Sequence, residues 1–135
     1  MLENNKCKLM KDMFFEAVKV AKPENFISKE VNIIFNNKRF NNVFVSGFGK
    51  ASGAMAKQLE RVFPLENCSN FFGNVIVPTG YEKKCKHIEV VFGSHPVPSQ
   101  NSILATKNIV EKAKTLGVND LMIVLISGGG SSLFC

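Results

Sequence analysis

Two short segments combine glycines with residues that can bind an anion. In the first, Lys50 follows Gly47 and Gly49. Glycines allow sharp turns and leave backbone N–H groups open to a ligand, and a lysine beside a helix N-terminus adds positive charge. The second segment is a run of three glycines between serines: Ser127, Gly128, Gly129, Gly130, Ser131 and Ser132. Both segments therefore predict binding of a phosphate or carboxylate.

The first segment departs from two known nucleotide-binding patterns. A P-loop has a glycine five residues before its Gly-Lys pair and Ser or Thr after it, but Phe44 and Ala51 occupy these positions. The dinucleotide pattern G-x-G-x-x-G needs a third glycine where Ser52 stands. The segment therefore supports neither a P-loop ATPase nor a standard NAD site. A solvated lysine after a tight turn stays open as the alternative to an anion site.

His95 and Ser131 raise the question of nucleophilic catalysis. Ser131 would need a base, and His95 is the plausible one. However, the sequence around Ser131 lacks the G-x-S-x-G pattern of serine hydrolases, so that activity is not favoured. A structural role for the His95 ring in its loop is at least as well supported, and we keep it as a candidate site residue.

The sequence contains no recognisable metal ligands. The 11 acidic residues are dispersed, and none lies inside a glycine loop. The four cysteines and two histidines lack the spacing of a zinc site. We therefore assign no residue of this chain to a metal.

Apolar periodicity predicts three helices. Stripes with helical spacing run through residues 8–21, 51–62 and 103–116. Pro23 is expected to end the first helix, and Ser99 suits the N-cap of the third.

Short apolar segments predict four strands between these helices. They cover residues 42–46, 73–78, 87–92 and 121–126. The last is an unbroken apolar run, which is typical of a strand buried on both faces. Residues 27–40, rich in Asn and Lys, are interpreted as a loop with at most a short extended piece.

This alternation predicts an α/β fold with a parallel, Rossmann-like sheet flanked by helices on both faces. In such sheets, ligands bind at the carboxyl ends of the strands. Residues 47–50, 94–98 and 127–132 each follow a predicted strand. We therefore expect these three loops to meet at one rim of the sheet.

Composition excludes several classes of protein. The formal net charge is +6, but the lysines are scattered, without an arginine-rich stripe or interleaved aromatics. This argues against a nucleic-acid partner. The first 20 residues are too charged for a signal peptide, and no apolar run is long enough to span a membrane. We expect a cytoplasmic protein without a membrane partner.

Four motifs, in order along the chain, resemble the N-terminal part of the type II glycerate kinases, the family that carries the MOFRL domain. Some members of that family are labelled hydroxypyruvate reductase. The motifs are SGFGKASGAMA at residues 46–56, VPTGY at 77–81, SHPVP at 94–98 and LISGGGSSL at 125–133.

The resemblance implies a kinase that uses ATP and Mg²⁺ to phosphorylate D-glycerate, commonly at the 2-hydroxyl, in a cleft between two α/β domains. It implies that Lys50 is catalytic and neutralises charge on the transferring phosphoryl group or on the substrate carboxylate. It also implies that residues 127–132 hold phosphate or glycerate oxygens through backbone amides. Ser99 departs from the usual Asp of the family, and Ser94 from its usual Gly.

The resemblance further implies that residues 1–135 form an incomplete N-terminal domain. The rest of that domain and the C-terminal MOFRL domain have no counterpart in this chain. The acidic ligands for Mg²⁺ and an arginine across the cleft are expected in those missing parts. We therefore expect an N-terminal fragment that is inactive alone, with a separately encoded C-terminal fragment as a possible partner. A hydroxypyruvate reductase and a non-catalytic split-gene remnant stay open as alternatives.

Overall fold

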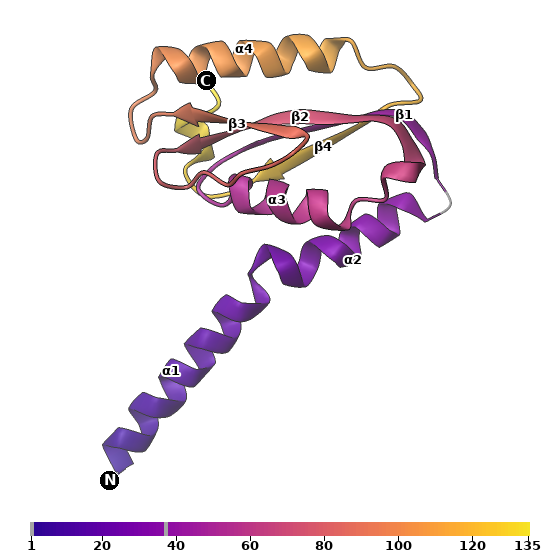
Figure 1. Ribbon diagram of the computed structural model, residues 1–135. Coiled ribbons are helices and arrows are strands. Elements are labelled where there is room, and N and C mark those ends of the chain that lie inside the picture. Colours follow the sequence, from indigo (N-terminus) through magenta and orange to yellow (C-terminus); the bar gives the residue numbers. More distant parts are fainter. Residues whose placement is uncertain (1, 37) are drawn as a thin grey trace.

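The computed structural model describes residues 2–36 and 38–135. Helices and strands alternate through most of this length (Figure 1). The α-helices and strands are α1 (Leu2–Val20), α2 (Pro23–Phe35), β1 (Phe40–Phe48), α3 (Ser52–Val62), β2 (Cys68–Pro78), β3 (Ile88–Gly93), α4 (Gln100–Lys114) and β4 (Leu121–Ile126). Two short 3-10 helices are η1 (Leu65–Asn67) and η2 (Gly130–Ser132).

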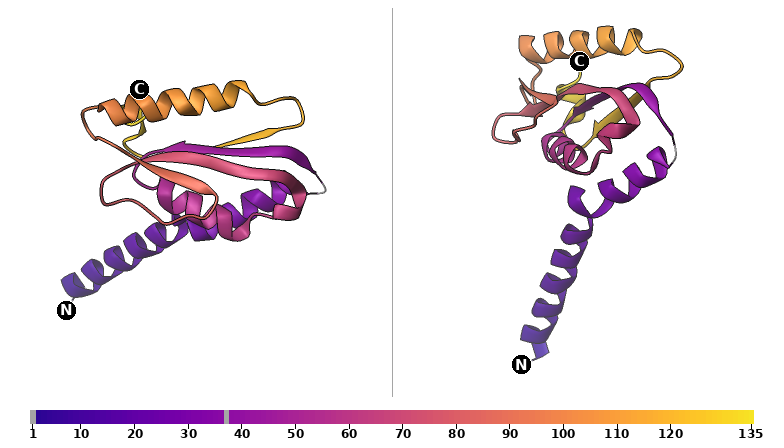
Figure 2. Two further views of the ribbon diagram at one scale, coloured as in Figure 1. Left: turned by 45° about the horizontal axis from the view of Figure 1, so that its top comes forward. Right: turned by 45° about the vertical axis from the view of Figure 1, so that its right-hand side comes forward.

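The four strands form one parallel sheet in the order β3-β2-β1-β4. Helix α4 covers one face, whereas α2 and α3 lie on the other (Figures 1 and 2). This arrangement confirms the predicted α/β fold with helices on both faces. Strand β1 lies between β2 and β4, so both of its edges are paired.

The prediction of a loop over residues 27–40 is wrong for most of that range. Helix α2 occupies it up to Phe35, and only residue 37 lies outside the described residues. Ile27, Val31 and Phe35 recur every four residues and are all buried. The polar residues Ser28, Lys29, Glu30 and Asn32 between them obscure this stripe in the sequence. Pro23 begins α2 instead of only ending the first helix, since its fixed φ suits a first helical turn.

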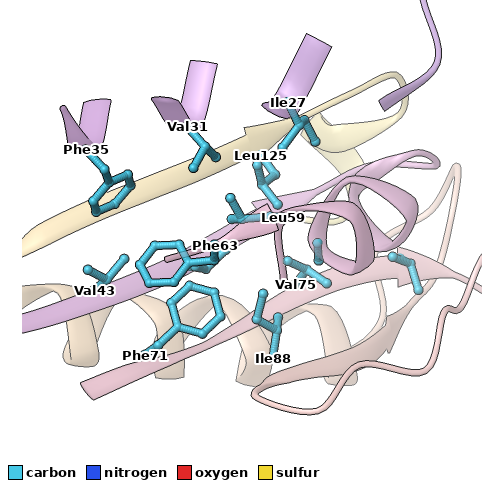
Figure 3. Packing of buried hydrophobic residues seen from close by; sticks show 13 residues of the cluster. Ile27, Val31, Phe35, Val43, Leu59, Phe63, Phe71, Val75, Ile88 and Leu125 are labelled. Atoms are coloured by element: carbon cyan, nitrogen blue, oxygen red, sulfur yellow. The ribbon is translucent and has the colours of Figure 1, made fainter. Parts of the chain in front are cut away.

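The larger core lies between the sheet and helices α2 and α3 (Figure 3). Its aromatic centre is Phe63, whose ring stacks on Phe71 at 4.0 Å and meets the edge of Phe35 at 4.9 Å. A smaller core lies under α4 on the opposite face. Its buried members are Phe44, Ile76, Ala105, Ile109 and Leu133.

Strand β4 is an edge strand and is not buried on both faces, which corrects the sequence prediction. Leu125 is only 6% exposed, but Val124 is 42% and Ile126 63% exposed. The reason is the position of α4, which packs on β2 and β3. One face of β4 therefore has no helix over it.

Helix α1 forms as predicted, but its apolar stripe is exposed. Met10, Met13 and Phe14 are 63–70% exposed. The helix projects away from the sheet and continues into α2 (Figures 1 and 2). No helix among the described residues combines the length and apolarity needed to cross a membrane.

The connection from β2 to β3 has no helix and is held by Glu60 of α3. The Glu60 carboxylate accepts hydrogen bonds from three consecutive N–H groups, those of Lys86 (2.7 Å), His87 (2.5 Å) and Ile88 (2.8 Å). Burial, and to a smaller extent the Glu60 charge, raise the pKa of the nearby Cys85 thiol to about 11. Cys85 is therefore a neutral packing residue at neutral pH.

We predict that Glu60→Gln destabilises the protein, because a carboxamide offers one acceptor oxygen and places an NH₂ group against the three donors. The expected loss is about 1–3 kcal/mol in the free energy of unfolding, measured by urea denaturation. Glu111→Gln is the matched control, since Glu111 forms only an exposed ion pair with Lys114 and its loss should change stability by less than about 1 kcal/mol. Equal effects of the two variants would contradict the role assigned to Glu60.

Asp120 joins the amino ends of β1 and β4. Its carboxylate accepts from the N–H of Gly117 (2.7 Å) and from the N–H and Nδ2 of Asn42 (2.9 and 2.8 Å). The Gly117 N–H contributes most to a lowering of the Asp120 pKa below its usual 3.8, and the Asn42 bonds add to it.

We predict that Asp120→Asn lowers the melting temperature at neutral pH. A lowered pKa in the folded state means that the charged group stabilises the fold above its unfolded pKa and that this stabilisation disappears as pH falls through the folded pKa. The difference between wild type and variant should therefore shrink below about pH 4. Melting curves from pH 2.5 to 7 check this, with exposed Asp12→Asn as the control. A difference independent of pH would contradict it.

Candidate functional site

The three predicted loops meet at the carboxyl end of the sheet. Strands β1 and β4 are parallel neighbours, so their ends lie side by side. The Lys50 N–H donates to the Gly128 carbonyl (3.0 Å), and the Ser127 N–H donates to the Phe48 carbonyl (3.1 Å). His95, from the third loop, lies against Gly129. The rim expected from the sequence is thus present.

The turn after β1 is shaped by its contact with Ser127. Gly49 has a φ of +123°, and a Cβ there would collide with the Ser127 side chain and carbonyl. The Ser127 hydroxyl accepts a hydrogen bond from the Ala51 N–H (2.9 Å) at the start of α3. In this structure Ser127 therefore joins the two loops, and Gly49 makes room for it.

Each glycine of the triple-glycine loop has a different environment. Gly128 is exposed, and a Cβ added to it would have nothing within 4 Å. Gly129 has a φ of +85° and lies under the His95 ring, while Gly130 is buried against Phe48. Among the described residues, no backbone acceptor receives the N–H of Gly128 or Gly129. The loop therefore has an open side that presents donors.

The residues after the loop anchor it. Leu133 is fully buried in the smaller core, and Phe134 stacks on Phe48 with ring centroids 4.7 Å apart. The Cys135 N–H donates to the hydroxyl of Thr106 in α4 (3.1 Å). The loop leads here into the short η2 turn, which these contacts hold in place.

Lys50 is exposed at the point where β1 turns into α3. Among the described residues, no carboxylate lies within 4 Å of its ammonium group. The ion pairs found in this part of the chain are Lys19–Glu16 and Lys114–Glu111. The first turn of α3 carries no acidic residue, and its N-cap, Ala51, has no capping side chain. Positive charge and helix dipole therefore add together at this point, which favours an anion.

The other predicted site residues divide into exposed and structural positions. Ser131 is exposed, whereas the Ser132 hydroxyl donates to the Gly129 carbonyl (3.1 Å). Gly47 lies inside β1, where a Cβ would collide with Leu125. Gly47 is therefore needed for close packing of the strands, and the exposed loop begins after it.

His95 is exposed beside the triple-glycine loop. Its loop is held by Ser102 of α4, whose hydroxyl accepts from the Ser94 N–H (3.2 Å). Ser99 caps α4 by accepting from the Ser102 N–H (3.3 Å), as the sequence predicted. No hydrogen bond joins His95 to Ser131 in the described part of the chain, so the nucleophile–base pair of a hydrolase is not formed.

Two structural residues of the site were missed by sequence reasoning. Ser52 is fully buried, and its hydroxyl donates to the carbonyls of Gly49 (2.8 Å) and Ile76 (3.3 Å). Ser102 completes a capping box with Ser99. The spacing of Ser99 and Ser102 is a readable signal for the second, but the role of Ser52 depends on β2 and has no local signal.

Residues 2–36 and 38–135 contain no group of three or more His, Cys, Asp or Glu side chains close enough to share a metal ion. The rim itself is lined by a lysine, a histidine, serines and glycines. These residues do not fit a Mg²⁺ site, because Mg²⁺ prefers carboxylate and water oxygens.

Comparison with known proteins identifies relatives of this chain. Glycerate 2-kinase from Pyrococcus horikoshii is 35% identical over 127 residues, which cover 88% of this chain and 28% of the relative. A putative hydroxypyruvate reductase from Agrobacterium vitis is 43% identical over 89 residues, covering 66% of this chain and 20% of that protein. The crystal structure of glycerate kinase from Thermotoga maritima superimposes with a TM-score of 0.81 and 26% identity, covering 97% of this chain and 30% of that one.

The chain thus spans less than a third of the length of these relatives. The family described as a domain of unknown function, DUF4147, matches residues 9–135. This match includes every strand of the sheet and the triple-glycine loop. The chain belongs to the DUF4147 family, together with glycerate 2-kinases.

Proposed function

We propose that this chain provides one wall of the active site of a glycerate kinase, which transfers a phosphoryl group from ATP to D-glycerate. The observation that carries the proposal is the exposed Lys50 ammonium, without a carboxylate partner among the described residues, beside the open N–H groups of Gly128 and Gly129. The names of the relatives from Pyrococcus horikoshii and Thermotoga maritima support glycerate as the substrate.

In the proposed reaction, the 2-hydroxyl oxygen of D-glycerate forms a bond to the γ-phosphorus of ATP. The bond from that phosphorus to the β,γ-bridging oxygen breaks, ADP leaves, and the hydroxyl proton passes to solvent or a base. The products are 2-phosphoglycerate and ADP. Negative charge on the phosphoryl oxygens is the main electrostatic demand of such a transfer.

Lys50 meets this demand by placing a positive charge at the N-terminus of α3. The N–H groups of Gly128 and Gly129 donate to phosphoryl or carboxylate oxygens on the open side of the loop. His95, against Gly129, adds a ring nitrogen at the same rim. Mg²⁺, which the family implies, has no fitting ligands among the residues described here, so no step is assigned to it in this chain.

The rim is open to solvent, since Lys50, His95, Gly128 and Ser131 are all exposed. Phosphoryl transfer requires that water be excluded and both substrates be held in line. We therefore propose that residues 1–135 bind anions weakly by themselves and transfer phosphoryl groups only together with the remainder of the family fold.

A hydroxypyruvate reductase is the second candidate, supported by the name of the Agrobacterium vitis relative. The turn after β1 argues against it, because the buried Ser52 stands where a dinucleotide site needs its third glycine. Oxidation of NADH by hydroxypyruvate without ATP would favour the reductase. Formation of ADP from ATP and D-glycerate without NADH would favour the kinase.

We predict that Lys50→Ala weakens binding of ATP and D-glycerate to the chain by at least about 10-fold, because a charge-assisted contact is lost. Chemical-shift titration measures this, with the signals of Gly128 and Gly129 as reporters. In protein complemented with the remainder of the fold, kcat should fall by about 100-fold or more. Lys57→Ala, an exposed lysine further along α3, is the control and should leave both values unchanged. Full activity in Lys50→Ala would remove this lysine from the mechanism.

We predict that Gly129→Ala abolishes the anion response while the fold is retained. A Cβ at this position would lie 2.8 Å from His95 Cδ2 and 2.9 Å from its Nε2, so the loop or the ring must move. Gly80→Ala is a matched control, since its φ of +88° resembles the +85° of Gly129 but a Cβ there meets nothing within 4 Å. Both variants should lose about 1–2 kcal/mol of stability from the positive φ. Unchanged titration by Gly129→Ala would contradict the role of the loop.

A further inference from the structure

Two buried polar side chains are neighbours in the middle of the sheet. Ser46 of β1 and Asn74 of β2 are in register, and each is 1% exposed. They lie on the α4 face, because Phe44 and Ile76, two residues away in the same strands, belong to the smaller core. Among the described residues, Ser46 Oγ and both polar atoms of the Asn74 carboxamide have no hydrogen-bond partner. Buried polar groups are nearly always hydrogen-bonded, so these atoms indicate a binding partner.

The Asn74 side chain lines a pocket between α4 and the edge strand β3. The pocket has a volume of about 220 Å³. Helix α4 packs on β2 and β3, so the helix forms one wall and these strands form the other. The polar residues that line it are Asn74, Glu89, Asn101 and Asn108. The unpartnered carboxamide therefore belongs to a polar pocket that a small molecule can enter.

The charge of this pocket is opposite to that of the rim. Glu89, which is in register with Asn74, is the charged side chain among the described residues that line the pocket. It takes part in neither of the two ion pairs found in the described part of the chain. The protein as a whole carries a formal charge of +6, yet the pocket carries a single negative charge. The pocket therefore favours a cation and does not suit ATP or glycerate.

The pocket walls distinguish an organic cation from a metal ion. Metal ions such as Ca²⁺ take six or more oxygen ligands, and carboxylates dominate their sites. Glu89 supplies one carboxylate here, and the remaining polar groups are neutral carboxamides. Val91 and Leu104 add apolar surface to the same pocket. An ammonium group on a short hydrocarbon chain uses both kinds of surface, because its N–H groups need acceptors and its methylenes need apolar contacts.

We propose that this pocket binds a small aliphatic amine in its ammonium form. The ammonium group donates to the Glu89 carboxylate and to the carboxamide oxygens of α4, and the hydrocarbon lies against Val91 and Leu104. Asn74 turns so that its Nδ2 donates to Ser46 Oγ, which leaves its Oδ1 as an acceptor for the ligand. The three unpartnered atoms thus all obtain partners.

The amine pocket is separate from the proposed kinase site. Glu89 is the second residue of β3, whereas Lys50 and the triple-glycine loop follow the carboxyl ends of β1 and β4. Strand β3 is also the sheet edge opposite β4. Lys50→Ala should therefore bind the amine like wild type while its response to ATP and D-glycerate is lost, so the two proposals can fail independently.

The experiment titrates isotopically labelled residues 1–135 with n-butylammonium chloride at constant ionic strength. The side-chain NH₂ signals of Asn74, Asn101 and Asn108 are the reporters. Two further probes test the chemistry: n-butanol has the same chain without the charge, and tetramethylammonium has the charge without N–H donors. Both should bind at least about 10-fold more weakly than n-butylammonium. Equal binding of the three probes, or shifts that do not saturate with n-butylammonium, would overturn the proposal.

Two variants locate the binding in this pocket. Glu89→Gln should weaken n-butylammonium binding by at least about 10-fold, because the charge-assisted hydrogen bond is lost. Glu111→Gln is the matched control: it removes the same charge from an exposed position on α4 that does not line the pocket, and it should bind like wild type. Binding by Glu89→Gln that equals that of the control would refute the site.

Asn74→Leu tests the buried carboxamide itself. Replacing an unpartnered buried polar group by an apolar one should not lower the melting temperature. The same variant should weaken n-butylammonium binding by at least about 10-fold, since the Oδ1 acceptor is lost. A retained melting temperature with unchanged binding would show that Asn74 has no part in the site and would overturn the proposal.

Discussion

The pairing of β1 with β4 is the constraint on which the site depends. These strands are distant in sequence but are in register from Val43–Leu121 to Phe48–Ile126. Because the carboxyl ends of the two strands lie side by side, the Lys50 turn lies beside the triple-glycine loop. Strand pairing is enough for this, and no ion pair between the two turns is needed. Hydrogen bonds from Lys50 to Gly128 and from Ala51 to Ser127 then hold the two turns together.

Close approach explains the glycines better than flexibility does. Gly47 lets β4 approach β1, Gly49 makes room for the Ser127 hydroxyl that accepts from the Ala51 N–H, and Gly130 rests on Phe48. Of the glycines at the rim that the structure describes, Gly128 is the one at which an added Cβ would meet nothing within 4 Å. The loop is thus in close contact with its neighbours at Gly129 and Gly130 and open at Gly128, an arrangement in which backbone donors can bind an anion with little ordering of the loop.

The same construction leaves apolar side chains exposed in two places. Met122, Val124 and Ile126 are exposed on one face of β4, and α1 carries an exposed apolar stripe away from the sheet. Both surfaces would be favourable to bury, at about 25 cal/mol for each Å² of apolar area.

Much of the fold and the location of the site could be predicted from the sequence, because both depend on local signals. Periodic apolar residues predict α3, α4 and the strands, Ser99 marks a helix start, and glycine-rich segments after strands indicate a rim. Helix α2 was missed because its buried stripe of Ile27, Val31 and Phe35 is diluted by polar residues, and only packing against α3 reveals it.

Only the tertiary structure decided which faces of the sheet are covered and which side chains are already hydrogen-bonded to the backbone. The apolar sequence of β4 resembles that of a central strand, yet strand order makes it an edge. The hydroxyls of Ser127 and Ser52 are bonded to backbone, while Lys50 stays open. Residue type and spacing determine which groups can bind a phosphate. Strand order and packing between distant segments determine which of them are free to do so, because those contacts join residues that are far apart in the chain.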